Sequence, residues 1–287
     1  MSMTPDQPPA RGPNHRAGKD DGGGSGGVVQ PRAQGPKTKR RPKGGSGWDT
    51  LKTVFYAVII AMVVRTVLIE PFSIPSRSML PTLLVGDYLF VSKFSYGYSK
   101  HSLPFSVSLF SGRIMFREPK RGDVAVFKKP TDNRTDYIKR IIGLPGDRIQ
   151  VSGGRLHING KVVPRRLMGR YIDVKHDYGG ARERYVSYRE SLPNGVSYVI
   201  LERSDNAPFV DNTEVYVVPK GHYFMMGDNR DNSQDSRYLS LVGFVPAENL
   251  VGRADFMFFS LREDKRWWQF WHWPAHIRWS RIFQAVR

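Results

Sequence analysis

The sequence predicts a mainly β, antiparallel fold preceded by one membrane-spanning helix and a disordered tail. Three observations predict it. From Pro71 onward, short runs rich in β-branched and aromatic residues alternate with turns that contain Gly, Pro, Asp or Asn, and no helical period of any length is present. One long apolar segment precedes these runs, and a segment rich in Gly and Pro precedes that segment in turn.

The first segment, residues 1–47, contains eleven Gly and seven Pro and almost no large apolar side chains. Such a chain cannot bury enough surface to offset the entropy of ordering it, so we expect a disordered tail. Five cations lie between Lys37 and Lys43, directly before the apolar segment. The positive-inside rule therefore predicts a cytoplasmic tail, with everything after residue 70 on the other side of the membrane.

The apolar segment, residues 48–70, is predicted to cross the membrane once. Its uninterrupted apolar run, 54–64, is short, but a helix over 51–69 would be about 28 Å long, close to the hydrocarbon thickness. Lys52 and Arg65 lie near its two ends, where their charges can reach the interfaces. No small-x-small site follows, which disfavours a cleaved signal peptide. A buried helix of a soluble domain is the alternative.

Residues 71–287 are predicted to form the β-rich domain. Within it, residues 155–215 look less like core and are expected to form a peripheral β subdomain, in which the sequence gives no role to 165–213. The C-terminal segment 261–287 carries five of the six tryptophans, mixed with Arg and His. Tryptophan beside cations is typical of a membrane interface, and packing against the domain is the alternative.

The net charge of +18 invites a nucleic-acid interpretation, but the distribution of charge argues against it. Residues 1–47 carry nine Lys or Arg against three Asp, and the rest of the excess is spread without a basic stripe interleaved with aromatics. We expect no nucleic-acid partner and a basic surface near anionic phospholipid. The chain has no cysteine, which excludes disulfides, thiolate metal sites and a cysteine nucleophile.

Two residues stand in contexts suited to peptide-bond chemistry. Ser78 follows Pro75, which biases the backbone toward extended or turn geometry, although a lone loop serine would usually be structural. Lys139 lies within the apolar run 137–142, where a buried lysine would lose its charge and could act as a base. A solvated strand face is the alternative for it. Together, a serine and a neutral lysine can cleave a peptide bond without His or Asp.

A dense polar loop, residues 226–238, follows an apolar strand end. It fails as a calcium loop, because Ser233 stands where Gly is needed and Leu239 where Glu is needed. Its side chains are instead expected to bond one another and to position a neighbouring catalytic group. No nucleophile elbow, zinc-protease helix or phosphate-binding loop is present, and the seven His are scattered. We expect no metal and no cofactor.

Taken together, these segments resemble the type I signal peptidases of the bacterial inner membrane, the Ser/Lys leader peptidases. The resemblance covers roughly residues 60–153 and 219–260. Five motifs occur in the family's order, at 70–83, 86–97, 121–127, 137–147 and 227–237.

The resemblance implies a role for each matching residue. Ser78 corresponds to the nucleophile and Lys139 to the general base. Ser76 matches the serine that completes the oxyanion hole with the Ser78 N–H, and Ser233 the serine that orients the lysine. The residues implied to hold the loop are Asp235, Arg237 and Arg140. The residues implied to line the pockets for small substrate side chains are Phe72, Ile74, Pro75, Leu83, Tyr137 and Ile138.

The predicted function is therefore a membrane-bound serine endopeptidase that removes signal peptides from exported preproteins after small residues of the Ala-x-Ala type. Its partners would be preproteins and the phospholipid membrane. It would cross the bacterial inner membrane once, with the catalytic domain in the periplasm. Two alternatives stay open. One is a regulatory or self-cleaving Ser/Lys protease on a related β scaffold, and the other is a non-enzymatic, membrane-tethered β domain.

Overall fold

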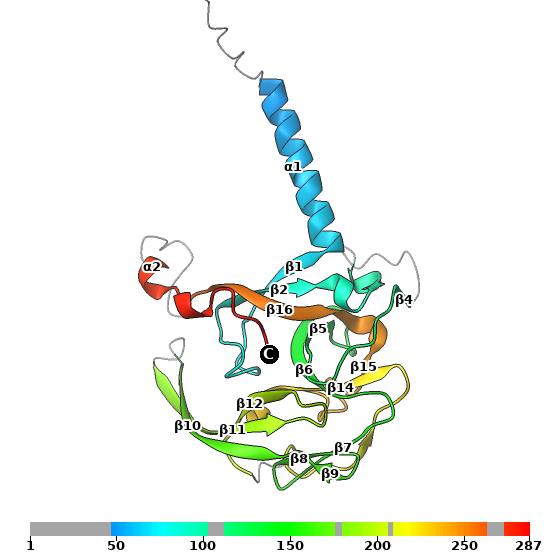
Figure 1. The fold of residues 1–287 in the computed structure, drawn as a ribbon, viewed down its shortest axis with the longest axis vertical. Helices are drawn as coiled ribbons and strands as arrows, with labels where there is room; N and C mark the ends of the chain where they lie inside the picture. The colour runs from blue at the N-terminus through cyan, green and yellow to red at the C-terminus, as the bar shows by residue number, and fades with distance from the viewer. Residues whose placement is uncertain (1–46, 103–111, 176–179, 206–208, 263–272) are drawn as a thin grey trace, which may run out of the picture. The chain divides into compact units, whose positions relative to one another are not determined.

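The computed structural model describes residues 47–102, 112–175, 180–205, 209–262 and 273–287 (Figure 1). The predicted disordered tail lies outside the described residues, apart from Gly47. Three of the tryptophans in the C-terminal segment, Trp267, Trp268 and Trp271, also lie outside them.

The helix α1 (Gly47–Val67) is the apolar segment predicted to span a membrane. It contains 21 residues, and none of them is buried against the rest of the chain. Among the described residues it is the one helix long and apolar enough to cross a membrane. It ends before the predicted boundary at residue 70, because Ile69 and Glu70 already belong to strand β1. Pro71 explains this early end, since proline disfavours helical geometry in the residue before it.

Antiparallel pairing throughout the main sheet confirms the predicted fold class. The seven strands occur in the order β1-β2-β16-β5-β6-β14-β15. Their bounds are β1 (Ile69–Ser73), β2 (Asp87–Ser92), β16 (Leu250–Ser260), β5 (Val124–Lys128), β6 (Asp136–Gly143), β14 (His222–Met226) and β15 (Val245–Pro246). The long strand β16 shifts register in its pairing with both β2 and β5. Such bulges bend a strand and increase its twist, which suits the curled sheet that Figure 1 shows.

Three smaller antiparallel sheets complete the β structure of the described residues. One contains β13 (Tyr216–Val217), β7 (Arg148–Ser152), β8 (Arg155–Ile158) and β9 (Lys161–Val162). Another contains β10 (Arg165–Lys175), β11 (Ala181–Ser191) and β12 (Ser197–Glu202), and it forms most of the region predicted to be peripheral. The last pairs β3 (Tyr98–Ser99) with β4 (Arg113–Ile114).

The helical elements of the domain are all short. They are η1 (Lys93–Ser95), η2 (Lys100–Ser102), η5 (Arg230–Asn232), η6 (Ala247–Asn249), α2 (Trp273–His276) and η8 (Trp279–Arg281).

The hydrophobic core fixes the segment that follows β1. Ile74, Met79 and Leu83 are buried in one cluster with apolar residues of β2, β5 and β16. Ser78 lies within this segment and is itself 7% exposed. The anchors on both sides therefore hold the backbone around Ser78 in place.

Candidate active site

A cleft of about 860 Å³ lies between the segment that contains Ser78 and one edge of strand β6. One wall runs from Glu70 to Ser78, and the opposite wall is residues 135–139. Residues 231–234 of the polar loop close one part of it. Among the pocket residues implied by the resemblance, five line this cleft: Phe72, Ile74, Pro75, Tyr137 and Ile138.

Both walls present backbone edges that are not fully paired. Strand β1 pairs with β2 only, so its second edge has no strand partner in the described part of the chain. Strand β14 pairs with β6 only from Arg140 to Gly143, which leaves the edge of residues 136–139 open on that side. An extended peptide can add to such edges through main-chain hydrogen bonds.

Ser78 and Lys139, 61 residues apart in sequence, meet at this cleft. Lys139 Nζ donates a hydrogen bond to Ser78 Oγ at 2.7 Å and another to Ile138 O at 2.8 Å. Both side chains line the cleft although both residues are buried. A neutral amine at the same separation can instead accept the hydroxyl proton, which is the first requirement of a general base.

The environment of Lys139 favours the neutral amine. Burial lowers the pKa of Lys139 to about 8, and the more distant charges of Asp235 and Asp228 only partly oppose this. The ring of Tyr137 lies 5.2 Å from Nζ and covers one side of the amine. About one tenth of the lysine is therefore unprotonated at pH 7, far more than of an exposed lysine.

The Ser76 hydroxyl lies on the same side of the segment as Ser78. The two oxygens, Ser76 Oγ and Ser78 Oγ, are 3.3 Å apart. Ser76 itself is exposed and lines the cleft. A hydroxyl there can reach an oxygen that develops charge next to Ser78.

The backbone at Ser78 is held by Asn229, a residue without a predicted role. Asn229 donates through its side chain to Arg77 O and through its backbone N–H to Ser78 O, each at 3.1 Å. Gly227 lies beside the same carbonyl, where a Cβ would overlap both Ser78 O and Ser233 Oγ. Both residues lie within the motif 227–237 that resembles the family, and this was the sequence signal that could have found them.

Buried ion pairs stabilise the polar loop, among them Asp235 with Arg237, Asp228 with Arg140 and Glu190 with Arg230. Arg237 donates to both oxygens of Asp235 at 2.9 Å, and the Gly227 N–H donates to the same carboxylate. Burial acts to raise the pKa of Asp235, but the charge of Arg237 outweighs it and the pKa is lowered. Arg140 pairs with Asp228 rather than with Asp235.

Two of the predicted site residues lack the expected contacts. Ser233 is buried and lines the cleft, and its side chain lies beside Asp235, whose pKa it helps to lower. The two hydrogen bonds of Lys139 Nζ among the described residues go to Ser78 Oγ and Ile138 O, so an orienting role of Ser233 stays a prediction. Leu83 is fully buried in the core and is not among the residues that line the cleft, so its pocket role also stays a prediction.

Comparison with known proteins identifies the family of this chain. The family described as "Signal peptidase, peptidase S26" matches residues 47–259. Signal peptidase I of Rickettsia typhi (strain ATCC VR-144 / Wilmington) is 41% identical over 249 residues, covering 80% of this chain and 90% of the relative. Signal peptidase I of Rickettsia prowazekii (strain Madrid E) is 40% identical over the same length and coverage. The chain belongs to the signal peptidase family.

The family confirms the predicted activity class: the chain is a peptidase that cleaves signal peptides. Its substrates are accordingly preproteins, and the apolar helix α1 is the expected attachment to a membrane. A solved structure of signal peptidase I from Enterococcus faecalis V583 aligns with 48% of this chain and 97% of its own length, at 25% identity and a TM-score of 0.27.

Proposed function

We propose that this signal peptidase works through a Ser78/Lys139 dyad. The observation that carries the proposal is the 2.7 Å contact between Lys139 Nζ and Ser78 Oγ inside a cleft, with no carboxylate bonded to the amine. Serine hydroxyls become effective nucleophiles when a base takes their proton, and a lysine with a lowered pKa supplies that base.

The reaction would proceed in two steps. Lys139 takes the Ser78 proton as Ser78 Oγ attacks the scissile carbonyl carbon, and the protonated amine then gives that proton to the leaving amine. An acyl-enzyme on Ser78 results. The neutral Lys139 then takes a proton from water, the hydroxide attacks the ester, and the proton returns to Ser78 Oγ as the new carboxyl end leaves.

The negative oxygen of each tetrahedral intermediate would be stabilised by the Ser76 hydroxyl and the Ser78 backbone N–H. The short distance between the two serine oxygens supports this assignment. Donors that are already oriented toward a developing oxyanion typically contribute about 10²–10³ in rate.

Substrate would bind as an extended strand between the two open edges of the cleft. The side chains of Phe72, Ile74 and Ile138 line that path, and we propose that they form apolar pockets that accept only small residues, as cleavage after Ala-x-Ala requires. We further propose that the protein lies in the bacterial inner membrane, with the tail before α1 in the cytoplasm and the β domain in the periplasm. The cationic cluster between Lys37 and Lys43 supports this orientation.

A cleavage assay on the full chain in detergent micelles tests the dyad. A preprotein with Ala at the first and third positions before the cleavage site is the substrate, and N-terminal sequencing identifies the cut. Ser78→Ala and Lys139→Ala are each expected to lower kcat/KM by at least about 10⁴-fold, because either change removes the activated nucleophile.

Two positions outside the cleft offer matched controls: Ser240→Ala removes an exposed hydroxyl, and Lys128→Ala removes a partly buried cation of strand β5. Both are expected to keep wild-type cleavage. Wild-type rates in Ser78→Ala and Lys139→Ala would refute the dyad. A preprotein with Trp in place of the Ala at the cut should remain intact, and its cleavage at the wild-type rate would refute the small-residue pocket.

A further inference from the structure

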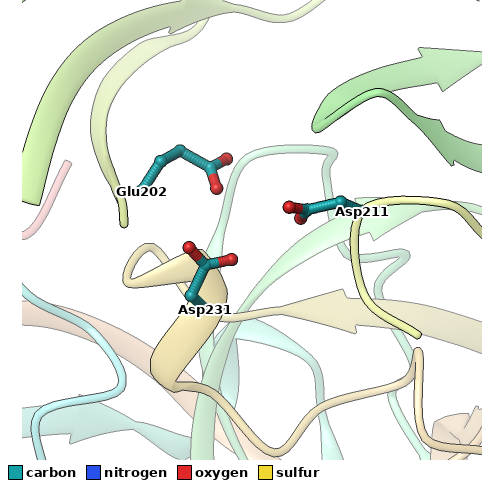
Figure 2. Close-up of side chains that lie close together, drawn as sticks. All are labelled: Glu202, Asp211 and Asp231. Atoms are coloured by element: carbon teal, nitrogen blue, oxygen red, sulfur yellow. The ribbon is translucent and has the colours of Figure 1, made fainter. Parts of the chain in front are cut away.

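Three carboxylates from separate segments converge beside the cleft, and one of them, Asp231, also lines it. Glu202 ends strand β12, Asp211 follows in the next turn, and Asp231 lies in the short helix η5 (Figure 2). One ligand oxygen from each lies within 4.8 Å of the other two. In Figure 2 all three side chains point toward one another.

Two of these carboxylates are almost completely buried: Glu202 is 2% exposed and Asp211 is 1% exposed. Within the described residues, Glu202 Oε2 and Asp231 Oδ1 are shielded from solvent and accept no hydrogen bond. Asp231 is oriented through its other oxygen, which accepts from the backbone N–H groups of Arg203 and Ser204. A buried polar atom without a partner is costly, so two in one cluster of carboxylates indicate a missing cationic ligand.

The arginine that pairs with Glu202, Arg165, does not supply a partner for Glu202 Oε2. Arg165 Nη1 is 3.9 Å from Glu202 Oε1, which is the other oxygen of this carboxylate. The guanidinium of Arg165 instead donates to both oxygens of Asp205, each at 2.9 Å.

We propose that Glu202, Asp211 and Asp231 bind a divalent cation, and that Ca²⁺ is the cation of best fit. The ligand set consists of carboxylate oxygens only, which suits a hard cation rather than zinc or copper. Calcium accepts oxygens at about 2.3–2.6 Å, so one ion can contact oxygens on opposite sides that are about 4.8 Å apart. Water would complete its six to eight ligands.

The cation would connect the peripheral sheet to the polar loop. Leu201, next to Glu202, donates its backbone N–H to Asp228 O at 2.9 Å, and Asp228 precedes the residue that holds Ser78. Asp231 itself reaches the wall of the cleft. A bound ion would therefore stabilise the loop without contact with substrate. This role goes beyond the peptidase activity and does not depend on the Ser/Lys dyad.

Thermal unfolding of the full chain in detergent, freed of metal with a chelator, tests the site. Adding CaCl₂ to about 100 times its dissociation constant is expected to raise the unfolding midpoint by about 5–10 °C. KCl at the same ionic strength should not do so, and an equal rise with MgCl₂ would overturn the assignment to Ca²⁺. Equilibrium dialysis should find one Ca²⁺ bound per chain, with the same dissociation constant that the thermal titration gives.

Glu202→Gln and Asp231→Asn keep the side-chain size and are expected to abolish both the shift and the binding. Glu214→Gln is the matched control, because it removes an exposed carboxylate close to Asp211 in the sequence and should keep both. The proposal is overturned if wild-type protein binds no Ca²⁺ in dialysis, a measurement that does not depend on how the variants fold. It is overturned equally if Glu202→Gln retains the full calcium shift, or if the wild-type midpoint does not move.

Discussion

Strand β6 places two buried cations side by side, and they have opposite chemical character. Lys139 is 4% exposed and Arg140 is 0% exposed. Successive side chains of a strand point to opposite faces, so these neighbours meet different partners. Arg140 Nε and Nη2 donate to the two oxygens of Asp228 at 2.8 and 2.7 Å, whereas Lys139 donates only to Ser78 Oγ and a backbone carbonyl.

The difference shows that a facing carboxylate, rather than burial, decides what a buried cation does. Burial opposes the charge of Arg140, but Asp228 outweighs it and the pKa is raised. Burial also opposes the charge of Lys139, and there it prevails, since the two carboxylates that act on it are bonded to Arg140 and Arg237. Arg140 is thereby kept as a structural ion, and Lys139 is kept as a potential base.

Replacing Lys139 by arginine is expected to have the largest effect on activity. Lys139→Arg places a group at the dyad that keeps its proton at every accessible pH, so it cannot accept one from Ser78. We expect a fall in kcat/KM of at least about 10⁴-fold in the preprotein cleavage assay. Arg253→Lys, an exchange of the same two residue types at a half-buried pair outside the cleft, is the control and should cleave normally. Cleavage by Lys139→Arg within tenfold of wild type would contradict a neutral lysine base.

Replacing each cation by methionine separates the two roles by stability. Arg140→Met leaves Asp228 buried and uncompensated, so the free energy of unfolding is expected to fall by about 3–5 kcal/mol. Lys139→Met removes a buried amine that faces no carboxylate, so the same free energy is expected to stay equal or to rise. Urea unfolding followed by circular dichroism measures both.

The pair of variants also provides its own control, because both changes place the same side chain on the same strand. Equal destabilisation by Lys139→Met and Arg140→Met would show that the two cations are held in the same way. The distinction between a structural ion and a base would then fail.

Local sequence patterns were sufficient for much of the fold. Short β-type runs with turns between them predicted the antiparallel sheets, because side-chain alternation and turn chemistry are local properties. The apolar segment predicted α1, although Pro71 ended it earlier than hydropathy indicated. The motifs around Ser78 and Lys139 also identified the family correctly, since each motif is a contiguous stretch.

Contacts between segments that are distant in the sequence could not be predicted from local sequence patterns. The position of Ser233 depends on its packing against Gly227, and the burial of Leu83 depends on which face of its segment meets the sheet. Glu202 and Asp231 stand 29 residues apart on different elements, and no spacing rule joins them. The expectation of no metal came from local motifs, which carry no information on ligands assembled by topology, and the cation site proposed above puts it to the test.

The smallest expected effect is the pH dependence of the wild-type enzyme. Because the neutral amine is the active form and the pKa of Lys139 is about 8, kcat/KM should rise about tenfold per pH unit below pH 8 and level off above it. At pH 7 the enzyme would then work at about one tenth of its plateau. Initial cleavage rates from pH 6 to 9.5 measure this, with circular dichroism at each pH to show that the fold is intact. Arg140 stays charged over this whole range. If kcat/KM stays constant or falls as the pH rises, Lys139 keeps its proton as Arg140 does, and the neutral-lysine base is contradicted.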